Sequence, residues 1–388
     1  MDGHNLTNQP RIDAAEILDG IREWVEIETP STDGAAVDGL SHLIERQFAD
    51  LDAAVTRVPG RDGFGDHLLF EAPWGDPGDK GILVVCHMDT VWQHGTLDRR
   101  PVKREGDKVF GPGIYDMKGG AYLAYYAYRH LIRQGRRTRL PVRFLFVSDE
   151  EVGSGTSRDL IEAEAARAKY ALVMEPGRNQ GSLVNCVVTA RKAVGRFVVT
   201  AHGVSSHAGV NHDHGRNAMR ELARQILVLE DLTDYARGIT VNVGVVSAGN
   251  PGFANVVPDK ATAEVDFRCP DAASAAEIAA KVHALTPIGP DIRLEITGGI
   301  NRPAYERDAG VAMLYGQAAT IARDLGFELP EVSTGGGSDG NFTAAKGVPT
   351  LDGLGVCGAG AHAAHEHLLY SSLEPRTELL LRLMESLA

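Results

Sequence analysis

Residues 81–89 read Gly81-Ile82-Leu83-Val84-Val85-Cys86-His87-Met88-Asp89, an apolar run that ends in a histidine and an acid. Such a run is typical of a strand that is buried on both faces of a parallel sheet. Side chains alternate along a strand, so His87 and Asp89 are expected to point the same way. Because open α/β sheets carry their chemistry at the carboxyl ends of their strands, the run predicts a functional site at that edge.

Segments of helical and strand-like pattern alternate around this run. Helices are expected over residues 11–27, 37–49 and 158–166 and after Gly119-Gly120, and strands near residues 55–58, 67–70, 142–147 and 170–173. This alternation predicts an α/β domain with a mostly parallel sheet and helices on both faces. A helix over 311–325, a strand at 350–351 and a helix over 374–387 would complete that domain.

The pattern changes between residues 189 and 300. Strands are expected at 196–201, 240–246, 261–267 and 293–296, with helices at 217–229 and 273–285. A β-α-β-β-α-β order is typical of a ferredoxin-like α+β module. The chain is therefore expected to have a catalytic domain in two parts, residues 1–188 and 301–388, interrupted by an inserted smaller domain, residues 189–300.

Composition excludes several classes of protein. A chain of 388 residues exceeds what one core usually covers, and a net charge of −13 without a Lys/Arg block argues against nucleic acid or an anionic membrane as a partner. No apolar stretch approaches the ~18 residues of a membrane span, and the first residues lack the pattern of a signal peptide. The four cysteines form no C-x-x-C pair, which indicates a reducing compartment, and we expect a cytoplasmic protein.

Several potential metal ligands follow strand-like or turn-rich segments. Taken singly, each has an ordinary alternative, because a lone histidine is usually structural and an acidic pair is usually a solvated turn. Three adjacent acids, Asp149 to Glu151, nevertheless follow the apolar residues Phe144–Val147, where they would repel one another without a cation. Catalytic zinc takes nitrogen and oxygen ligands, and two zinc ions ~3.5–4 Å apart can share a carboxylate. The whole set, which predicts a two-metal hydrolase, is His87, Asp116, Glu150, Glu151, Glu175 and His362.

From about Ile17 to the C-terminus the chain resembles the co-catalytic di-zinc aminoacylase/carboxypeptidase family, and most closely its bacterial folate-cleaving glutamate carboxypeptidase branch. The resemblance rests on HMDTV (87–91), EGDKVFGPGIYDMKGG (105–120), DEEVGS (149–154), SHAG (206–209), TGGGSD (334–339) and the segment 362–366. It implies a zinc-peptidase-type sheet, an inserted dimerisation or lid domain, and two Zn²⁺ per chain, for which Co²⁺ or Mn²⁺ are possible substitutes.

The same resemblance implies a role for each residue of the metal set. One zinc would be held by His87 and Glu175, and the other by Glu151 and His362. Asp116 would bridge the two ions and precede a cis peptide bond to Met117, while Asp89 would orient His87 and Glu150 would be the general base. The ligand histidine of the family stands four residues before a glutamate, which favours His362 over His365.

The resemblance also implies substrate contacts from the inserted domain. His207 would come from the partner subunit of a homodimer and polarise the scissile carbonyl. Asn255 and Arg268 match family positions that contact substrate, and Arg302 matches a hinge-region arginine. An arginine can bind a carboxylate through its fork, and a surface salt bridge is the alternative for both arginines. The glycine run with Gly337 and Ser338 is expected to offer backbone donors to the same carboxylate. A histidine cluster lies around His207 and contains His202, His212 and His214. A separate metal site is disfavoured for it, because apart from Asp213 it has no acid or cysteine to complete a coordination shell.

The expected activity is hydrolysis of the amide bond of an N-acyl amino acid or short peptide with a free C-terminal carboxylate, with glutamate the first choice for the released residue. An aminoacylase or dipeptidase with a non-acidic preference is the alternative. Gly336-Gly337-Ser338-Asp339-Gly340 also matches G-x-S-x-G, so a serine hydrolase that uses Ser338 is a remote alternative that requires a strand before the serine and a helix after it.

Overall fold

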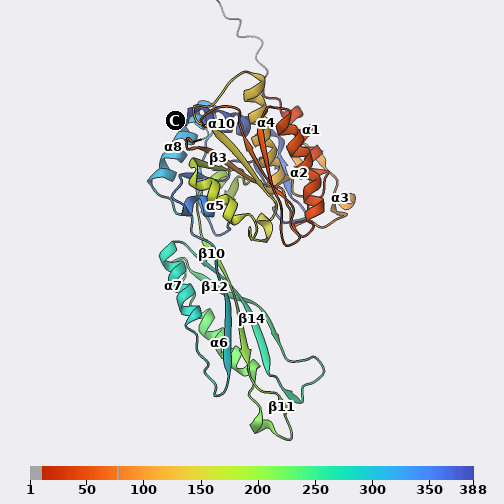
Figure 1. Ribbon diagram of the computed structural model, residues 1–388, viewed down its shortest axis with the longest axis vertical. Coiled ribbons are helices and arrows are strands. Elements are labelled where there is room, and N and C mark those ends of the chain that lie inside the picture. The colour runs from red at the N-terminus through yellow and green to blue at the C-terminus, as the bar shows by residue number, and fades with distance from the viewer. Residues whose placement is uncertain (1–10, 77) are drawn as a thin grey trace, which may run out of the picture. The chain divides into compact units, whose positions relative to one another are not determined.

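The computed structural model describes residues 11–76 and 78–388, which form two compact units (Figure 1). The first unit takes in the chain up to Ala190 together with Arg307–Ser333 and Ser338–Ala388, and the second contains Arg191–Glu306 and Thr334–Gly337. The prediction of an α/β fold interrupted by an inserted α+β module is confirmed. Within the described residues, no helix has the length and apolar character needed to span a membrane.

A six-stranded sheet of order β1-β2-β6-β3-β7-β17 forms the centre of the first unit. Within this sheet β2 runs against the other five strands, so the sheet is mostly parallel. The apolar run at residues 81–89 supplies β3, which lies between β6 and β7 and is buried at every position. The strands are β1 (Ala54–Val58), β2 (His67–Glu71), β3 (Gly81–His87), β6 (Val142–Val147), β7 (Ala168–Val173) and β17 (Thr350–Leu351).

The apolar side chains of β3 point alternately to the two faces of the sheet, and helices cover both faces to bury them. Ile82 and Val84 belong to the larger core, and Leu83 and Val85 belong to the smaller one. The larger core is completed by α1 (Ala14–Val25), α2 (Gly34–Ala49), α4 (Gly119–Arg133), α8 (Ala309–Asp324) and α10 (Leu373–Ser386). The smaller core is completed by α5 (Arg158–Ala166) and α9 (Gly340–Ala345).

Two small sheets of the first unit were not predicted, because their strands are too short for a clear alternation. One has the order β18-β19-β5-β4 and follows the short helix α3 (Thr96–Arg99). Its strands are β4 (Lys103–Glu105), β5 (Lys108–Phe110), β18 (Gly358–Ala359) and β19 (His367–Leu369). Since β5 pairs with β19, this sheet ties the chain before Asp116 to the segment that follows His362. The other sheet contains β8 (Arg178–Gln180), β9 (Leu183–Arg191) and β16 (Glu331–Thr334).

The second unit has an antiparallel sheet of order β12-β14-β10-β15. Asn217 and Asp271 cap its two helices by accepting hydrogen bonds from backbone N–H groups in the first turn. A short hairpin pairs β11 (Ser206–His207) with β13 (Val256–Val257). The main elements are β10 (Ala193–His202), α6 (Ala218–Glu230), β12 (Thr240–Ala248), β14 (Lys260–Cys269), α7 (Ala272–His283) and β15 (Arg293–Arg302), which share a separate apolar core.

The loop between β6 and α5 carries the acids Asp149 to Glu151 and is held by buried hydrogen bonds. Asp149 is fully buried, and its carboxylate accepts from the Thr156 hydroxyl at 2.7 Å, the Ser157 hydroxyl at 2.6 Å and the Thr156 N–H at 2.6 Å. The expectation that all three acids need a cation is therefore wrong for Asp149, because hydroxyl and amide donors already stabilise its charge.

His67 on β2 anchors the same loop. The Ser148 N–H donates to its Nδ1 at 3.3 Å, so the neutral ring carries its proton on Nε2, which lies 3.2 Å from the Thr156 hydroxyl oxygen. Burial lowers the pKa of His67 in spite of the nearby acids Asp149, Asp339, Asp66 and Asp89, and this favours the neutral ring. His67 thus joins the two ends of the loop that carries Glu150 and Glu151.

Replacing His67 with Phe should lower the free energy of unfolding by about 1–3 kcal/mol, because the buried Ser148 N–H would lose its acceptor. Urea denaturation measures this loss, and the same change at the exposed His42 is the control, with an expected effect within about 0.5 kcal/mol. The pKa of His67 is lower in the folded than in the unfolded chain, so the stability that neutral His67 contributes is lost as the pH falls below the ordinary histidine value of 6.5. The difference between wild type and His67→Phe should therefore shrink on acidification. Equal stabilities at pH 8 would contradict the anchoring role.

Candidate metal centre

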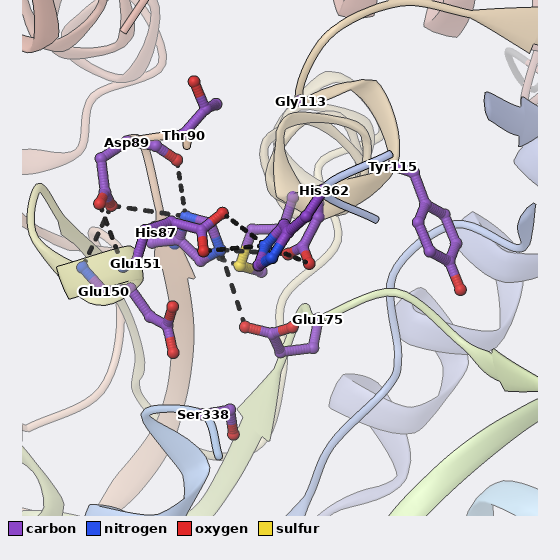
Figure 2. A network of polar contacts seen from close by, with 12 residues as sticks. His87, Asp89, Thr90, Gly113, Tyr115, Glu150, Glu151, Glu175, Ser338 and His362 are labelled. Atoms are coloured by element: carbon purple, nitrogen blue, oxygen red, sulfur yellow. Dashed lines mark hydrogen bonds and ion pairs between the residues drawn. The ribbon is translucent and has the colours of Figure 1, made fainter. Parts of the chain in front are cut away.

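Two histidines face the two carboxylate oxygens of Asp116. The Nε2 atom of His87 lies 3.4 Å from Asp116 Oδ1 and 3.7 Å from Glu175 Oε1 (Figure 2). The Nε2 atom of His362 lies 3.6 Å from Asp116 Oδ2 and 3.0 Å from Glu151 Oε2. The structure therefore brings together all five residues that the sequence suggested as metal ligands, with Asp116 between the two imidazoles.

Neighbouring strands deliver three of these side chains to one edge of the sheet. His87 ends β3, Glu151 follows β6 and Glu175 follows β7. The three strands are parallel, and β3 pairs with β6 on one side and with β7 on the other. Asp116 lies in the turn Ile114–Lys118 before α4, where the peptide bond to Met117 is cis, as the resemblance implied. His362 lies between β18 and β19 with a φ of 60°, a left-handed conformation that histidine adopts more readily than most residues.

The tautomer of His87 suits a metal ligand. Its Nδ1 lies 2.9 Å from the main-chain oxygen of Asp89, and because a carbonyl oxygen can only accept, Nδ1 carries the proton of the neutral ring. The lone pair of Nε2 then faces Asp116 and Glu175. A backbone carbonyl that receives the other ring N–H of a ligand histidine is a common arrangement around metals.

Asp89 also fixes the acidic loop through its carboxylate. Its Oδ1 accepts the Glu150 N–H at 3.2 Å, and its Oδ2 accepts the Glu151 N–H at 3.1 Å and the Ser31 hydroxyl at 2.7 Å. The carboxylate itself lies 3.5 Å from His87 Nδ1. Asp89 therefore orients His87 mainly through its backbone, while its side chain holds the two adjacent glutamates in place.

Two groups of potential ligand atoms meet at His87, each with its atoms within 4.8 Å of one another. One contains His87, Asp116 and Glu151, and the other contains His87, Glu150 and Glu175. Glu150 therefore lies beside the ligand set and close enough to exchange a proton with a molecule held there. Figure 2 shows the Glu150 carboxylate on the same side of His87 as the Glu175 carboxylate.

Sequence reasoning used Glu366 only to choose between two histidines and missed its contacts. Its buried carboxylate accepts the N–H groups of Gly113 at 2.9 Å, Tyr115 at 3.0 Å and Asp116 at 3.1 Å, and the indole N–H of Trp92 at 2.7 Å. Burial raises the pKa of Glu366 to about 7 even though these donors oppose the shift. Glu366 thus shapes the turn that presents Asp116, and its spacing from His362 was the signal that could have identified it.

Arg178 is a second residue that the sequence did not indicate. One of its terminal nitrogens, Nη2, lies 3.6 Å from Glu175 Oε2, the oxygen other than the one nearest His87. Its position at the start of β8, three residues after a ligand candidate, carried no motif that would have singled it out.

The donors crowded at this edge fit a cation. Burial opposes protonation of His87, yet Asp116 and Asp89 hold its pKa well above the usual value. Glu151 raises the pKa of His362 to about 9 against the effect of partial burial. Carboxylates that raise the pKa of neighbouring imidazoles make a site that attracts positive charge, and imidazole nitrogens with carboxylate oxygens are the donor set that zinc prefers.

No hydrogen bond or ion pair joins the His365 side chain to these ligand candidates within the described residues. The main-chain oxygen of His365 accepts from the His367 ring at 2.8 Å. Of the two candidate histidines, the structure thus favours His362 as the ligand.

In the second unit, His207 and Asn255 lie together at the hairpin of β11 and β13. His207 pairs with Val256, the neighbour of Asn255, and the Ala208 N–H donates to the main-chain oxygen of Asn255 at 2.8 Å. His207 is exposed, and its Nδ1 accepts the Gly209 N–H at 3.1 Å. The neutral ring therefore carries its proton on Nε2, which can donate a hydrogen bond.

The two arginines that were predicted to bind substrate, Arg268 and Arg302, have side chains that are less accessible to a substrate. Arg268 donates from Nε and Nη2 to the two carboxylate oxygens of Asp266, at 2.8 and 2.9 Å, so its fork is already occupied. Arg302 is only 4% exposed and packs against Gly337, where a Cβ would come within 2.6 Å of the arginine Cδ.

Ser338 is a structural residue, contrary to both roles suggested for it. It is fully buried; its hydroxyl donates to Asp352 at 2.5 Å and its N–H donates to Asn341 at 2.9 Å. These bonds leave it no hydrogen for a substrate carboxylate and do not present it as a nucleophile. Although α9 follows closely, β16 ends four residues earlier, at Thr334, so the strand-to-helix elbow of serine hydrolases is not formed.

The other histidines of residues 202–214 belong to no group of potential metal ligands in the described part of the chain. His202 pairs with Glu295 at 3.0 Å, and His212 and His214 lie in an exposed turn. Among the residues that the structure describes, the groups of potential ligands are confined to the first unit.

Comparison with known proteins identifies the family of the chain. The family model described as Peptidase family M20/M25/M40 matches residues 83–386. The chain is 32% identical over 371 residues to "Carboxypeptidase G2" of Pseudomonas sp. (strain RS-16), covering 93% of this chain and 86% of that protein. It is 28% identical to a "Succinyl-diaminopimelate desuccinylase" of Ralstonia pickettii (strain 12J), covering 89% of this chain and 92% of that protein.

Solved structures share the fold. The M20 family metallo-carboxypeptidase Sso-CP2 from Sulfolobus solfataricus superposes with a TM-score of 0.74 at 18% identity, covering 97% of this chain and 100% of that one. Aminopeptidase PepT from Bacillus cereus superposes with a TM-score of 0.72 at 20% identity, covering 96% and 98% of the two chains. The chain thus belongs to the peptidase family M20/M25/M40 and is a zinc-dependent metallopeptidase or amidohydrolase.

Proposed function

We propose that this protein is a di-zinc amidohydrolase of the carboxypeptidase type, which hydrolyses an N-acyl amino acid or short peptide with a free C-terminal carboxylate. The observation that carries the proposal is that the Asp116 carboxylate faces both histidines. Its Oδ1 lies 3.4 Å from His87 Nε2, and its Oδ2 lies 3.6 Å from His362 Nε2. One carboxylate flanked by two imidazoles, each with a glutamate of its own, suits two ions that share a bridging ligand.

His87 and Glu175 would hold one zinc ion and Glu151 and His362 the other, with Asp116 between them. When bound, the ions would supply the Lewis acidity that polarises a carbonyl and lowers the pKa of water. Glu150 takes the proton from the attacking water and passes it to the leaving amine. Asp89 supports this step because its carboxylate holds the N–H groups of both Glu150 and Glu151.

His207 stabilises the negative charge that develops on the carbonyl oxygen. The Gly209 N–H occupies Nδ1, so Nε2 carries the proton and donates to that oxygen. Asn255, beside His207 at the same hairpin, supplies an amide for the substrate. Arg302 and the glycine run that contains Gly337 would bind the substrate carboxylate from the second unit.

Glutamate is the first choice for the released residue. The motifs resemble the glutamate carboxypeptidase branch, and this resemblance is the basis of the choice. Arg268 gives it little further support, because its guanidinium already pairs with Asp266. The alternative is an aminoacylase or dipeptidase with a non-acidic preference. Similarity to a desuccinylase supports the same reaction class with a different acyl group.

We infer a homodimer in which His207 acts in the active site of the partner subunit. The edge strand β12 of the second unit exposes Val245 and Val246, and the neighbouring helix α6 exposes Leu227 at 67%. An edge strand beside exposed apolar side chains is a natural surface for pairing two identical copies. The protein is expected to act in the cytoplasm.

Glu150→Gln should reduce turnover by about 10²–10⁴-fold, because the general base is lost, while two zinc ions remain bound. Glu151→Gln, one residue away, is the matched variant and should lose zinc. Elemental analysis after gel filtration, together with turnover rates, separates the two roles. Loss of zinc from Glu150→Gln with full retention by Glu151→Gln would reverse the assignment.

Mixed dimers test the trans role of His207. Chains with Glu150→Ala and chains with His207→Ala should each be inactive, yet exchange of subunits should restore part of the activity. One site of the hybrid would receive a wild-type Glu150 and a wild-type His207. If tagged heterodimers can be isolated and remain inactive, His207 does not act across the dimer.

The substrate preference is tested with N-benzoyl-L-glutamate, N-benzoyl-L-glutamine and N-benzoyl-L-leucine. The zinc-loaded enzyme should show the highest kcat/KM for glutamate, by at least about tenfold over leucine, a difference of about 1.4 kcal/mol. A preference for leucine would remove the acidic specificity and leave the two-zinc mechanism standing. If the enzyme releases no amino acid from any of the three substrates, the proposed reaction is contradicted.

A further inference from the structure

A pocket of about 480 Å³ in the first unit is lined by residues that lie close in the chain to two of the metal-ligand candidates. Gly111 and Pro112 form one wall and directly precede the turn that presents Asp116. Ala364 belongs to another wall and follows His362 by two residues, so their Cα atoms are at most about 7.6 Å apart. The pocket therefore lies beside two of the segments that carry metal-ligand candidates.

The charge on the pocket wall is opposite to that of the chain. Arg99, Arg100 and Lys103 line it, in a protein with a net charge of −13. Of the two acids in the lining, Glu105 pairs with Lys103 at 2.8 Å, and Glu366 directs its carboxylate to backbone N–H groups and the Trp92 indole. The two arginines thus give this wall an uncompensated positive charge.

Arg100 is held in place without a carboxylate partner. Its guanidinium lies over the Trp92 ring, 4.0 Å from the centroid, and the Trp92 indole is fixed by its bond to Glu366. Among residues 11–76 and 78–388, its side chain makes no hydrogen bond or ion pair. Stacking occupies the face of a guanidinium but leaves its in-plane N–H groups available for a bidentate carboxylate.

We infer that this pocket is a subsite for a carboxylate on the acyl part of the substrate, with Arg100 as the specificity-determining residue. The inference rests on the proposed function, which assigns the amino-acid carboxylate to the second unit and leaves the other side of the scissile amide for this pocket. The preferred substrates are then amino acids that are N-acylated by a dicarboxylic acid or by an acidic residue. Arg99 adds positive charge around the same carboxylate, whereas Glu105 compensates Lys103.

Two substrates of equal chain length test this subsite, N-glutaryl-L-glutamate and N-pentanoyl-L-glutamate. The zinc-loaded wild type should favour the glutaryl substrate at least about tenfold in kcat/KM, mainly through KM. Arg100→Gln should lower the glutaryl value to the pentanoyl value and leave the pentanoyl value within about twofold. No preference in the wild type, or a preference that survives Arg100→Gln, would overturn the inference.

Arg104→Gln is the matched control. Arg104 also stacks on an aromatic ring, that of Tyr370 at 3.4 Å, but its Nε donates to the Gly106 carbonyl and it does not line the pocket. This variant should keep the wild-type preference for the glutaryl substrate. Loss of the preference in Arg104→Gln as well would point to the general charge of this region and overturn the role of Arg100.

A binding measurement separates this inference from the proposed function. Glutarate, but not neutral glutaramide, should shift the NMR signal of the Trp92 indole N–H in metal-free protein, and Arg100→Gln should abolish the shift. If the wild type cleaves neither substrate, the proposed function fails, and the subsite is then decided by this shift alone. Absence of the shift overturns the subsite. A shift without any acyl preference in an active enzyme assigns the pocket to a free anion and overturns the substrate role.

Discussion

The structure of the catalytic unit depends on the electrostatic cost of gathering carboxylates at one edge of a buried sheet. Asp89, Asp116, Glu150, Glu151 and Glu175 meet around His87 and His362, where burial disfavours uncompensated charge. Asp89 is neutralised by loop N–H groups and a serine hydroxyl. Asp116 and Asp89 raise the pKa of His87, and Glu151 raises the pKa of His362. A pair of metal ions would compensate the gathered carboxylates more fully.

Support for this crowded edge also comes from residues outside the set of ligand candidates. Glu366 holds the Asp116 turn by three backbone N–H groups, and His67 closes the loop that carries the two adjacent glutamates. Such contacts fix the ligands before any ion binds, which reduces the reorganisation that binding requires. The rigid part of the site thus lies in the first unit, whereas His207 and Asn255 lie on an exposed hairpin of the second.

The sequence predicted the regular elements and the ligand set because their signals are local. The strand Val142–Val147 and the helix Arg158–Ala166 were placed with the correct bounds, and an apolar run followed by potential ligands marked each strand end of the site. The short strands β4, β5, β18 and β19 were missed because two or three residues carry no periodicity. Hydrogen-bond partners were harder to predict. Asp149, Arg268 and Ser338 were each judged by residue type, but a sequence does not show which group a side chain will meet. Asp149 accepts from Thr156, Arg268 donates to Asp266 and Ser338 donates to Asp352.

The central claim is that Asp116 is shared by two metal ions, and anomalous scattering at the zinc absorption edge from crystals of the zinc-loaded protein tests it most directly. The account predicts two peaks about 3.5–4 Å apart, one near His87 and Glu175 and one near His362 and Glu151, with the Asp116 carboxylate between them. A single peak at this edge, or zinc bound instead among the histidines of residues 202–214, would contradict it.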